Sequence, residues 1–184
     1  RGSRVTLAFP SVGATENILL AACTAKGETV ITNAAQEPEI VDLAGFLNAM
    51  GGKVTGAGKS TVRVEGVKKL HPAHWRVMPD RIAAATWLAM VCASRGRICL
   101  KEFPTHLLQG VYPVLEEMGA KLRLEERQVS LVQEGRLRRV KQLRTMPYPG
   151  FPTDAQSVFL AALTTASGTS LIVQNIFTVR VRPV

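Results

Sequence analysis

Polar residues that could do chemistry stand at the starts of apolar helices in this sequence. The segment Ser11-Val-Gly13 leads into an Ala- and Leu-rich stretch that ends before Gly27. Backbone N–H groups at a helix start have no partner within the helix, so this turn could bind phosphate oxygens. The alternative is that Ser11 or Thr15 simply caps the helix, and the residues alone favour that alternative.

Asp154 is the second residue of this kind, because it stands in Phe151-Pro-Thr-Asp154, directly before another apolar helix. A carboxylate at this place could act as a general base on a substrate hydroxyl. It could equally be the acidic residue that the N-terminus of a helix favours electrostatically. Both interpretations of Asp154 remain open on the residues alone.

Other residue types predict no further site. The Gly56-Ala-Gly-Lys59 segment is too short for a phosphate-binding loop and precedes a strand, so we expect a hairpin turn. The cysteines lack paired metal-ligand spacing and the histidines are isolated from one another, so no metal site is expected. Cys23 and Cys92 lie in apolar helices and should be buried, whereas Cys99 lies on a strand and is the one that can face solvent.

The elements that must position these residues recur three times. Each copy begins with an apolar helix that ends near a glycine and continues into a strand, at intervals of about 70 residues. We expect these glycines, Gly27, Gly96 and Gly168, to close their helices in a left-handed conformation. Since the helices are apolar on nearly every face, we expect them to be buried on all sides. The predicted strands are 4–9, 29–33, 60–65, 97–101, 128–132 and 170–174.

The second halves of the first two copies also match. Phe46-Leu-Asn-Ala-Met-Gly-Gly-Lys-Val54 pairs with Val114-Leu-Glu-Glu-Met-Gly-Ala-Lys-Leu122, and Glu65-Gly66 pairs with Glu134-Gly135. The predicted fold class is therefore α/β with mixed sheets (α+β), built from repeated helix-strand-helix-strand-strand units. Because the sequence begins in a strand and stops within the third copy, we expect a fragment of a longer array.

Composition narrows the function classes. The 184 residues are 46% hydrophobic, and no apolar stretch reaches the roughly 18 residues of a membrane span, so we expect no membrane insertion. The net charge of +9 is compatible with an anionic partner. The basic run 136–144 interleaves basic and apolar residues, and with aromatics at 5% we favour a solvated face over a nucleic-acid surface. Unpaired cysteines without a signal peptide indicate a reducing, cytoplasmic location.

Four segments of the sequence resemble the UDP-N-acetylglucosamine enolpyruvyl transferase (1-carboxyvinyltransferase) family. The same segments distinguish this sequence from the related shikimate-pathway transferase. They are Phe9-Pro-Ser-Val-Gly-Ala-Thr-Glu-Asn-Ile18, Asn33-Ala-Ala-Gln-Glu-Pro-Glu-Ile-Val-Asp-Leu43, Pro79-Asp-Arg-Ile82 and Pro147-Tyr-Pro-Gly-Phe-Pro-Thr-Asp-Ala-Gln156. The resemblance implies the inside-out α/β barrel fold, with three units in each of two domains, helices inside and sheets outside. Residues 1–78 would be the last unit of one domain, and 79–184 two units of the other, the second incomplete.

The resemblance also implies site residues. Phe9, Pro10, Ser11, Val12 and Gly13 match the nucleotide-sugar loop, Asp154 matches the general base, and Ile176 matches a sugar-nucleotide contact. Arg180 matches an arginine of the anionic active site, and Glu37, Asp80 and Arg81 match polar residues of the interdomain cleft. The chain departs from the family pattern after Ile176, where it reads Phe177-Thr-Val-Arg-Val-Arg-Pro-Val184, and at Ala83, where the family usually has an acid.

The implied reaction transfers the enolpyruvyl group of phosphoenolpyruvate to the 3-hydroxyl of UDP-N-acetylglucosamine with release of phosphate, the first committed step of bacterial peptidoglycan synthesis. The expected partners are these two substrates and the missing repeat units of the same polypeptide, with no cofactor, nucleic acid or membrane. The family's acid is a loop cysteine whose motif none of the three cysteines matches. The alternative hypothesis is a catalytically inactive module that binds a nucleotide sugar or nucleic acid.

Overall fold

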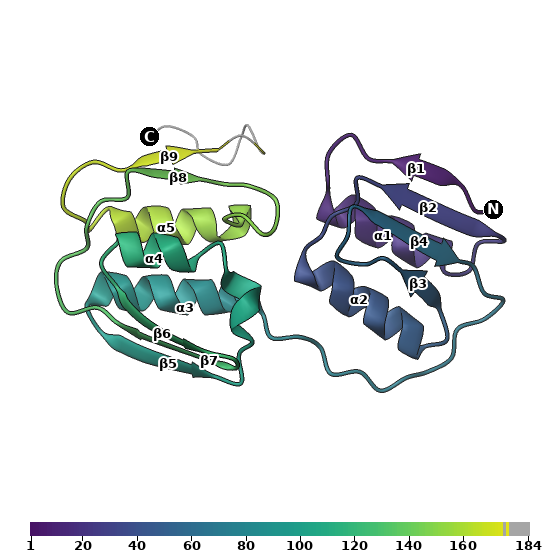
Figure 1. The fold of residues 1–184 in the computed structure, drawn as a ribbon, viewed down its shortest axis with the longest axis horizontal. Helices are drawn as coiled ribbons and strands as arrows, with labels where there is room; N and C mark the ends of the chain where they lie inside the picture. Colours follow the sequence, from purple (N-terminus) through teal and green to yellow (C-terminus); the bar gives the residue numbers. More distant parts are fainter. Residues whose placement is uncertain (175, 177–184) are drawn as a thin grey trace. The chain divides into compact units, whose positions relative to one another are not determined.

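The computed structural model describes residues 1–174 and residue 176. The chain splits into two compact units, Arg1–Met78 and Pro79–Val184 (Figure 1). The first contains β1 (Arg4–Thr6), α1 (Val12–Ala22), β2 (Glu28–Thr32), α2 (Pro38–Ala49), β3 (Lys53–Thr55) and β4 (Thr61–Glu65). The second contains α3 (Arg81–Ser94), β5 (Arg97–Lys101), η1 (Thr105–Leu108), α4 (Tyr112–Glu117), β6 (Lys121–Glu125), β7 (Gln128–Val132), β8 (Gln142–Arg144), η2 (Thr153–Ala155), α5 (Gln156–Leu163) and β9 (Leu171–Val173).

The first unit is one four-stranded sheet with two helices packed on it. The strand order is β1-β2-β4-β3, with β1 parallel to β2 and the other pairs antiparallel. In β4, Val62 and Val64 are buried while Arg63 between them is exposed, the alternation of a strand with one covered face. The predicted hairpin turn at 56–59 is confirmed, since it joins β3 to β4.

The second unit places its helices between two sheets. The order β5-β7-β6 makes an antiparallel sheet and β8-β9 a parallel pair, and Figure 1 shows α3, α4 and α5 between them. The α3 and α5 helices pack against each other. Strands β5 and β7 occupy the predicted residues, and the predicted mixed α/β fold class is confirmed.

The expectation that the first helix of each copy is buried on all sides is wrong for the described chain. Leu20 of α1, Trp87 and Met90 of α3, and Leu160 of α5 are all exposed. Their neighbours in the chain, Leu19, Leu88 and Phe159, are fully buried and lie about 100° away around each helix. Each helix therefore has one covered side and one uncovered apolar side.

The helix ends also differ from the expectation. In α3 the left-handed residue is Arg95, with φ 56°, rather than Gly96. The N–H groups of Arg95 and Gly96 donate to the carbonyls of Cys92 and Val91. This is the Schellman pattern with its left-handed position one residue earlier than the glycine. In α1 the cap residue is Cys23, and the left-handed Gly27 lies in the turn that follows.

The basic run 136–144 is only partly a solvated face. Its apolar residues Leu137, Val140 and Leu143 are buried. Arg136 donates to the carbonyls of Thr165 and Ala166 after α5, and Arg138 donates to the carbonyl of Glu116 in the last turn of α4. Cations at helix C-termini stabilise the carbonyls that have no partner within the helix.

The cysteine predictions are confirmed, because Cys23 and Cys92 are buried and Cys99 is exposed. Burial raises the pKa of the Cys92 thiol to about 11. Within the described residues, no helix is long and apolar enough to cross a membrane. The same residues contain no group of three or more His, Cys, Asp or Glu side chains placed to hold a metal ion.

The structure corrects the register of the internal repeat. In β2 and β4, Glu28 lies opposite Glu65, and the next N–H, of Gly66, donates to the carbonyl of Gly27. In the second unit the corresponding bond to the carbonyl of Gly96 comes from the N–H of Gln133. Gly66 therefore corresponds to Gln133 rather than to Gly135, because the strand ladder, and not the shared Glu-Gly pair, sets the alignment.

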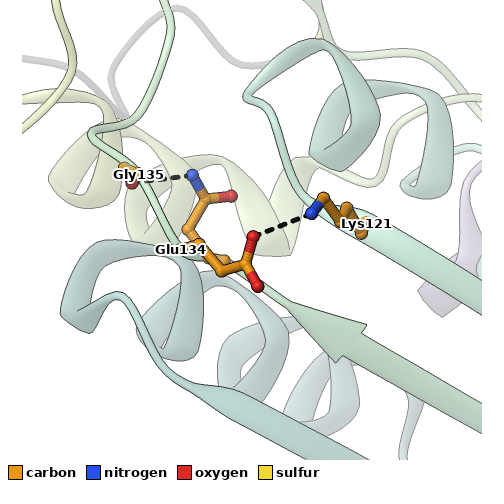
Figure 2. Close-up of polar contacts among 4 residues, drawn as sticks. Lys121, Glu134 and Gly135 are labelled. Atoms are coloured by element: carbon orange, nitrogen blue, oxygen red, sulfur yellow. Dashed lines mark hydrogen bonds and ion pairs between the residues drawn. The ribbon is translucent and has the colours of Figure 1, made fainter.

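Gly135 lies instead beyond the end of β7, beside an exposed ion pair. Figure 2 shows Lys121 and Glu134, whose side chains are 2.7 Å apart. The hydrogen bond from Lys121 lowers the pKa of Glu134. Both side chains are more than two-thirds exposed, so the pair contributes little to stability.

We predict that alanine at Gly66 lowers the stability of the protein, whereas alanine at Gly135 leaves it almost unchanged. A Cβ at Gly66 would overlap the backbone carbonyl of Ala25, whereas one at Gly135 would meet nothing within 4 Å. Gly66→Ala should destabilise the first unit by at least about 2 kcal/mol, because backbone must move to admit the methyl group. Gly135→Ala should change stability by less than about 0.5 kcal/mol. Urea unfolding followed by circular dichroism measures both, and equal midpoints for the two variants would contradict the packing at Gly66.

Candidate functional site

The loop 9–13 leads from β1 into the N-terminus of α1. Ser11 is the N-cap residue, and its hydroxyl accepts a hydrogen bond of 3.3 Å from the N–H of Ala14. The cap predicted as an alternative is therefore present. Phe9 is 44% exposed, and the position where Gly13 would carry a Cβ has no atom within 4 Å. The first turn of α1 is thus open to a ligand at Gly13, although Ser11 also caps the helix.

Two residues tie this loop to the segment that follows β2. Thr15 is fully buried, and its hydroxyl donates to the carbonyl of Ser11 at 2.8 Å while accepting from the N–H of Ala35 at 3.0 Å. On the other side of the loop, the Asn33 amide donates to the carbonyl of Leu7 at 2.8 Å. The loop is held at both of its ends by residues 33–35.

Acidic side chains lie near the starts of α1 and α2. Glu37 is only 8% exposed and precedes Pro38, the first residue of α2. Burial, and after it the negative charge of Glu39 in the first turn of α2, raises the pKa of Glu16 in α1. Glu16 in α1 and Glu39 at the start of α2 therefore act on each other as like charges, with burial of Glu16 as the larger effect.

The predicted residues Asp80 and Arg81 form the start of α3. One Asp80 carboxylate oxygen accepts from the N–H groups of Ile82 at 2.8 Å and Ala83 at 3.0 Å, so Asp80 is a helix cap. The Arg81 side chain is 7% exposed, and its guanidinium carbon lies 5.7 Å from the centroid of the Tyr148 ring. This is within cation–π range, so α3 contacts the loop that precedes Asp154.

That loop, residues 147–153, is held at several further points. The Tyr148 hydroxyl donates to the carbonyl of His106 at 3.3 Å. The backbone of Gly110 lies so close to the carbonyls of Pro149 and Gly150 that a Cβ there would clash. Phe151 is buried and packs edge-to-face on Phe159 of α5, with ring centroids 5.0 Å apart.

Asp154 is exposed at the end of this supported loop, in the first turn of η2. The N-cap positions of η2 and α5 belong to Pro152 and Ala155, neither of which has a polar side chain. Asp154 therefore lies at the helix start without being the N-cap residue. Its exposed position, beside a loop that packs on α5, suits a group that acts on a substrate.

Ile176 is linked to the same helix start. Its N–H donates to the side-chain oxygen of Gln174 at 3.0 Å, and the Gln174 amide donates to the side-chain oxygen of Gln156 at 2.8 Å. Gln156 is the first residue of α5 and is 3% exposed. Arg180, the other predicted catalytic residue, lies outside the described residues.

The predicted site residues thus form two groups, one in each unit. The 9–13 loop and Glu37 belong to the first unit, and Asp80, Arg81, Asp154 and Ile176 belong to the second. Sequence reasoning treated Thr15 only as a possible cap, and it missed Tyr148, Gln156 and Gln174 as supporting residues. Tyr148 and Gln156 do stand inside one of the family-like segments, which was the available signal.

Comparison with known proteins finds relatives that carry the same name. The UDP-N-acetylglucosamine 1-carboxyvinyltransferase of Finegoldia magna is 47% identical over 178 residues, which cover 96% of this chain and 42% of the relative. The enzyme of the same name from Shewanella sp. (strain ANA-3) matches with the same identity and coverage. The chain therefore spans less than half the length of these relatives. The resemblance found in the sequence is confirmed.

Solved structures support the fold. The enolpyruvyl transferase NikO from Streptomyces tendae superposes with a TM-score of 0.74 at 24% identity, covering 90% of this chain and 40% of that one. An EPSP synthase from Acinetobacter baumannii superposes with a TM-score of 0.60 at 24% identity, covering 94% and 40%. The family model of EPSP synthase (3-phosphoshikimate 1-carboxyvinyltransferase) matches residues 1–182, so the chain belongs to this family of enolpyruvyl transferases.

Proposed function

We propose that this chain is part of a UDP-N-acetylglucosamine 1-carboxyvinyltransferase, which transfers the enolpyruvyl group of phosphoenolpyruvate to the 3-hydroxyl of the nucleotide sugar and releases phosphate. The observation that carries the proposal is 47% identity over 96% of the chain to relatives of that name. Because the chain spans 42% of their length, the activity belongs to the longer polypeptide. The reaction serves peptidoglycan synthesis, and hence cell shape and division, in the bacterial cytoplasm.

Within that polypeptide, we assign residues 1–78 to the last repeat unit of one domain and residues 79–184 to two units of the other. The internal repeat supports this assignment, since α1 and α3 each begin a copy that continues into β2 and β5. The missing repeat units would cover the apolar sides of the helices that carry Leu20, Trp87 and Leu160.

The nucleotide sugar is the ligand that the start of α1 suits. A helix N-terminus carries partial positive charge and presents N–H donors, which match the oxygens of a diphosphate. The open position at Gly13 lets a ligand approach the backbone closely. Phe9, Pro10, Ser11, Val12 and Gly13 are assigned to this contact. Ile176 is assigned to sugar-nucleotide binding on its own match to the family.

Asp154 is assigned as the general base. It takes the proton of the sugar 3-hydroxyl while that oxygen bonds to C2 of phosphoenolpyruvate, and an acid delivers a proton to C3. The resulting tetrahedral intermediate loses a proton from C3 and expels phosphate, which restores the double bond. Arg180 is assigned to the anionic groups of the substrates, and Glu37, Asp80 and Arg81 to the polar surround.

The acid is assigned to the remaining polypeptide rather than to the cysteines of this chain. Cys23 and Cys92 are buried, and burial raises the pKa of both thiols. Cys99 is exposed, but it lies on β5 in a context unlike the family's acid loop. The catalytically inactive module is the weaker hypothesis, since Arg136 and Arg138 of its basic run already bind helix-end carbonyls.

The first test is phosphate release by a polypeptide extended to the length of the relatives. With phosphoenolpyruvate present, UDP-N-acetylglucosamine should support turnover and shikimate 3-phosphate should not. Turnover with the shikimate acceptor alone would identify the other enzyme of the family. Binding of either acceptor without phosphate release would favour the inactive module.

Gly13→Ala should separate ligand binding from folding. Alanine is a better helix residue than glycine by up to about 1 kcal/mol, and the new methyl group meets no protein atom within 4 Å. The variant should therefore be at least as stable as the parent. It should bind UDP-N-acetylglucosamine at least about tenfold more weakly by calorimetry, because the methyl group stands where the ligand approaches. Unchanged affinity would remove Gly13 from the site.

Asp154→Asn should lower kcat by about a hundredfold or more, because an amide cannot accept the hydroxyl proton. The melting temperature should stay close to that of the parent, since asparagine has nearly the size of aspartate, keeps a side-chain oxygen as an acceptor, and replaces an exposed residue. Glu126→Gln is the control, an exposed carboxylate in the turn between β6 and β7 of the same unit. If both variants keep the parental kcat, Asp154 is not the base.

A further inference from the structure

We propose that Thr15 is a positioning residue of the nucleotide-sugar site, whose buried hydroxyl fixes the carbonyl of Ser11, and with it the first turn of α1, against the segment that follows β2. This inference rests on the proposed function, because it concerns the same ligand. Thr15 does not contact the ligand in this proposal. It acts through the backbone of the 9–13 loop.

The Thr15 hydroxyl is both a hydrogen-bond donor and a hydrogen-bond acceptor. It donates to the carbonyl of Ser11 at 2.8 Å and accepts from the N–H of Ala35 at 3.0 Å. The Ser11 carbonyl also accepts the N–H of Thr15 at 3.0 Å, the first bond of the helix. Two donors from one residue therefore set the direction of the Ser11 peptide, which is the point where the loop turns into the helix.

The bond from Ala35 distinguishes Thr15 from an ordinary helical threonine. Threonines in helices often donate to the carbonyl four residues earlier, and Thr86 of α3 does so to Ile82 at 2.8 Å. Thr15 makes this bond and also receives one from a residue 20 positions away. Thr15, Ala34 and Ala35 are each at most 1% exposed, so water cannot replace the hydroxyl.

Residues 33–35 therefore hold the 9–13 loop in place through hydrogen bonds at both of its ends. Asn33 takes a left-handed conformation, with φ 56°, and holds the carbonyl of Leu7, while Ala35 holds Thr15. The N–H of Ala34 donates to the carbonyl of Ser60 beside β4, which ties the segment to the sheet. A shift of the Ser11 peptide would move the helix N–H groups that we assign to the ligand, and such sites lose function over small displacements.

Thr15→Val tests the proposal in the extended polypeptide, because valine keeps the shape and removes both hydrogen bonds. We expect KM for UDP-N-acetylglucosamine to rise about tenfold and KM for phosphoenolpyruvate to stay within about twofold. Thr15→Ser keeps the hydroxyl and should restore KM for the nucleotide sugar to within about twofold of the parent. Thr86→Val removes the same type of helical bond in the second unit and should leave both KM values unchanged.

The outcomes separate the two proposals. If the parent enzyme releases no phosphate with UDP-N-acetylglucosamine, the proposed function fails and this inference fails with it. If the parent is active, three results overturn the inference alone: an unchanged KM in Thr15→Val, an equal rise of both KM values, or a defect in Thr15→Ser as large as that in Thr15→Val.

A second pair of variants covers the case in which Thr15→Val does not fold. Thr15→Cys has a side chain as short as that of Thr15→Ser, but its thiol makes longer and weaker hydrogen bonds. A KM for UDP-N-acetylglucosamine several times higher in Thr15→Cys than in Thr15→Ser supports the positioning role. Equal KM values for the two variants would overturn it.

Discussion

The packing of α3 against α5 is the contact on which the second unit depends. A three-stranded and a two-stranded sheet each expose an apolar face that neither can bury alone, and the helices between them cover both. Phe159 at this centre is fully buried and supports Phe151, which precedes Asp154. The position of an exposed carboxylate thus follows from apolar packing beneath it.

Local features of the fold were predictable because their causes are local. Alternating apolar residues fix β4 and β7, and glycines mark the hairpin between β3 and β4. The buried cysteines were predictable because they stand among apolar helix residues. The register between the two copies was not predictable, because a shared Glu-Gly pair is weaker evidence than the hydrogen bonds that place Gln133 opposite Gly96.

In the candidate site too, some residues were predictable from the sequence and the contacts between distant residues were not. Ser11, Gly13 and Asp154 could be identified from family-like segments at helix starts. Thr15 and Ala35 also stand in family-like segments, but the bond between them was not predictable, since neither residue type indicates a partner 20 positions away. Likewise, Arg138 could be recognised as basic but not as the partner of a carbonyl at the end of α4, because that requires knowing which helix ends nearby.

The two copies differ in how their cap side chains satisfy the start of the first helix. In α3, the Asp80 carboxylate accepts from the N–H groups of Ile82 and Ala83 at 2.8 and 3.0 Å, so that helix start is satisfied by its own chain. In α1, the shorter Ser11 side chain reaches only Ala14, at 3.3 Å. A change of cap residue from aspartate to serine thus lowers, from two to one, the number of first-turn N–H groups that the cap side chain satisfies.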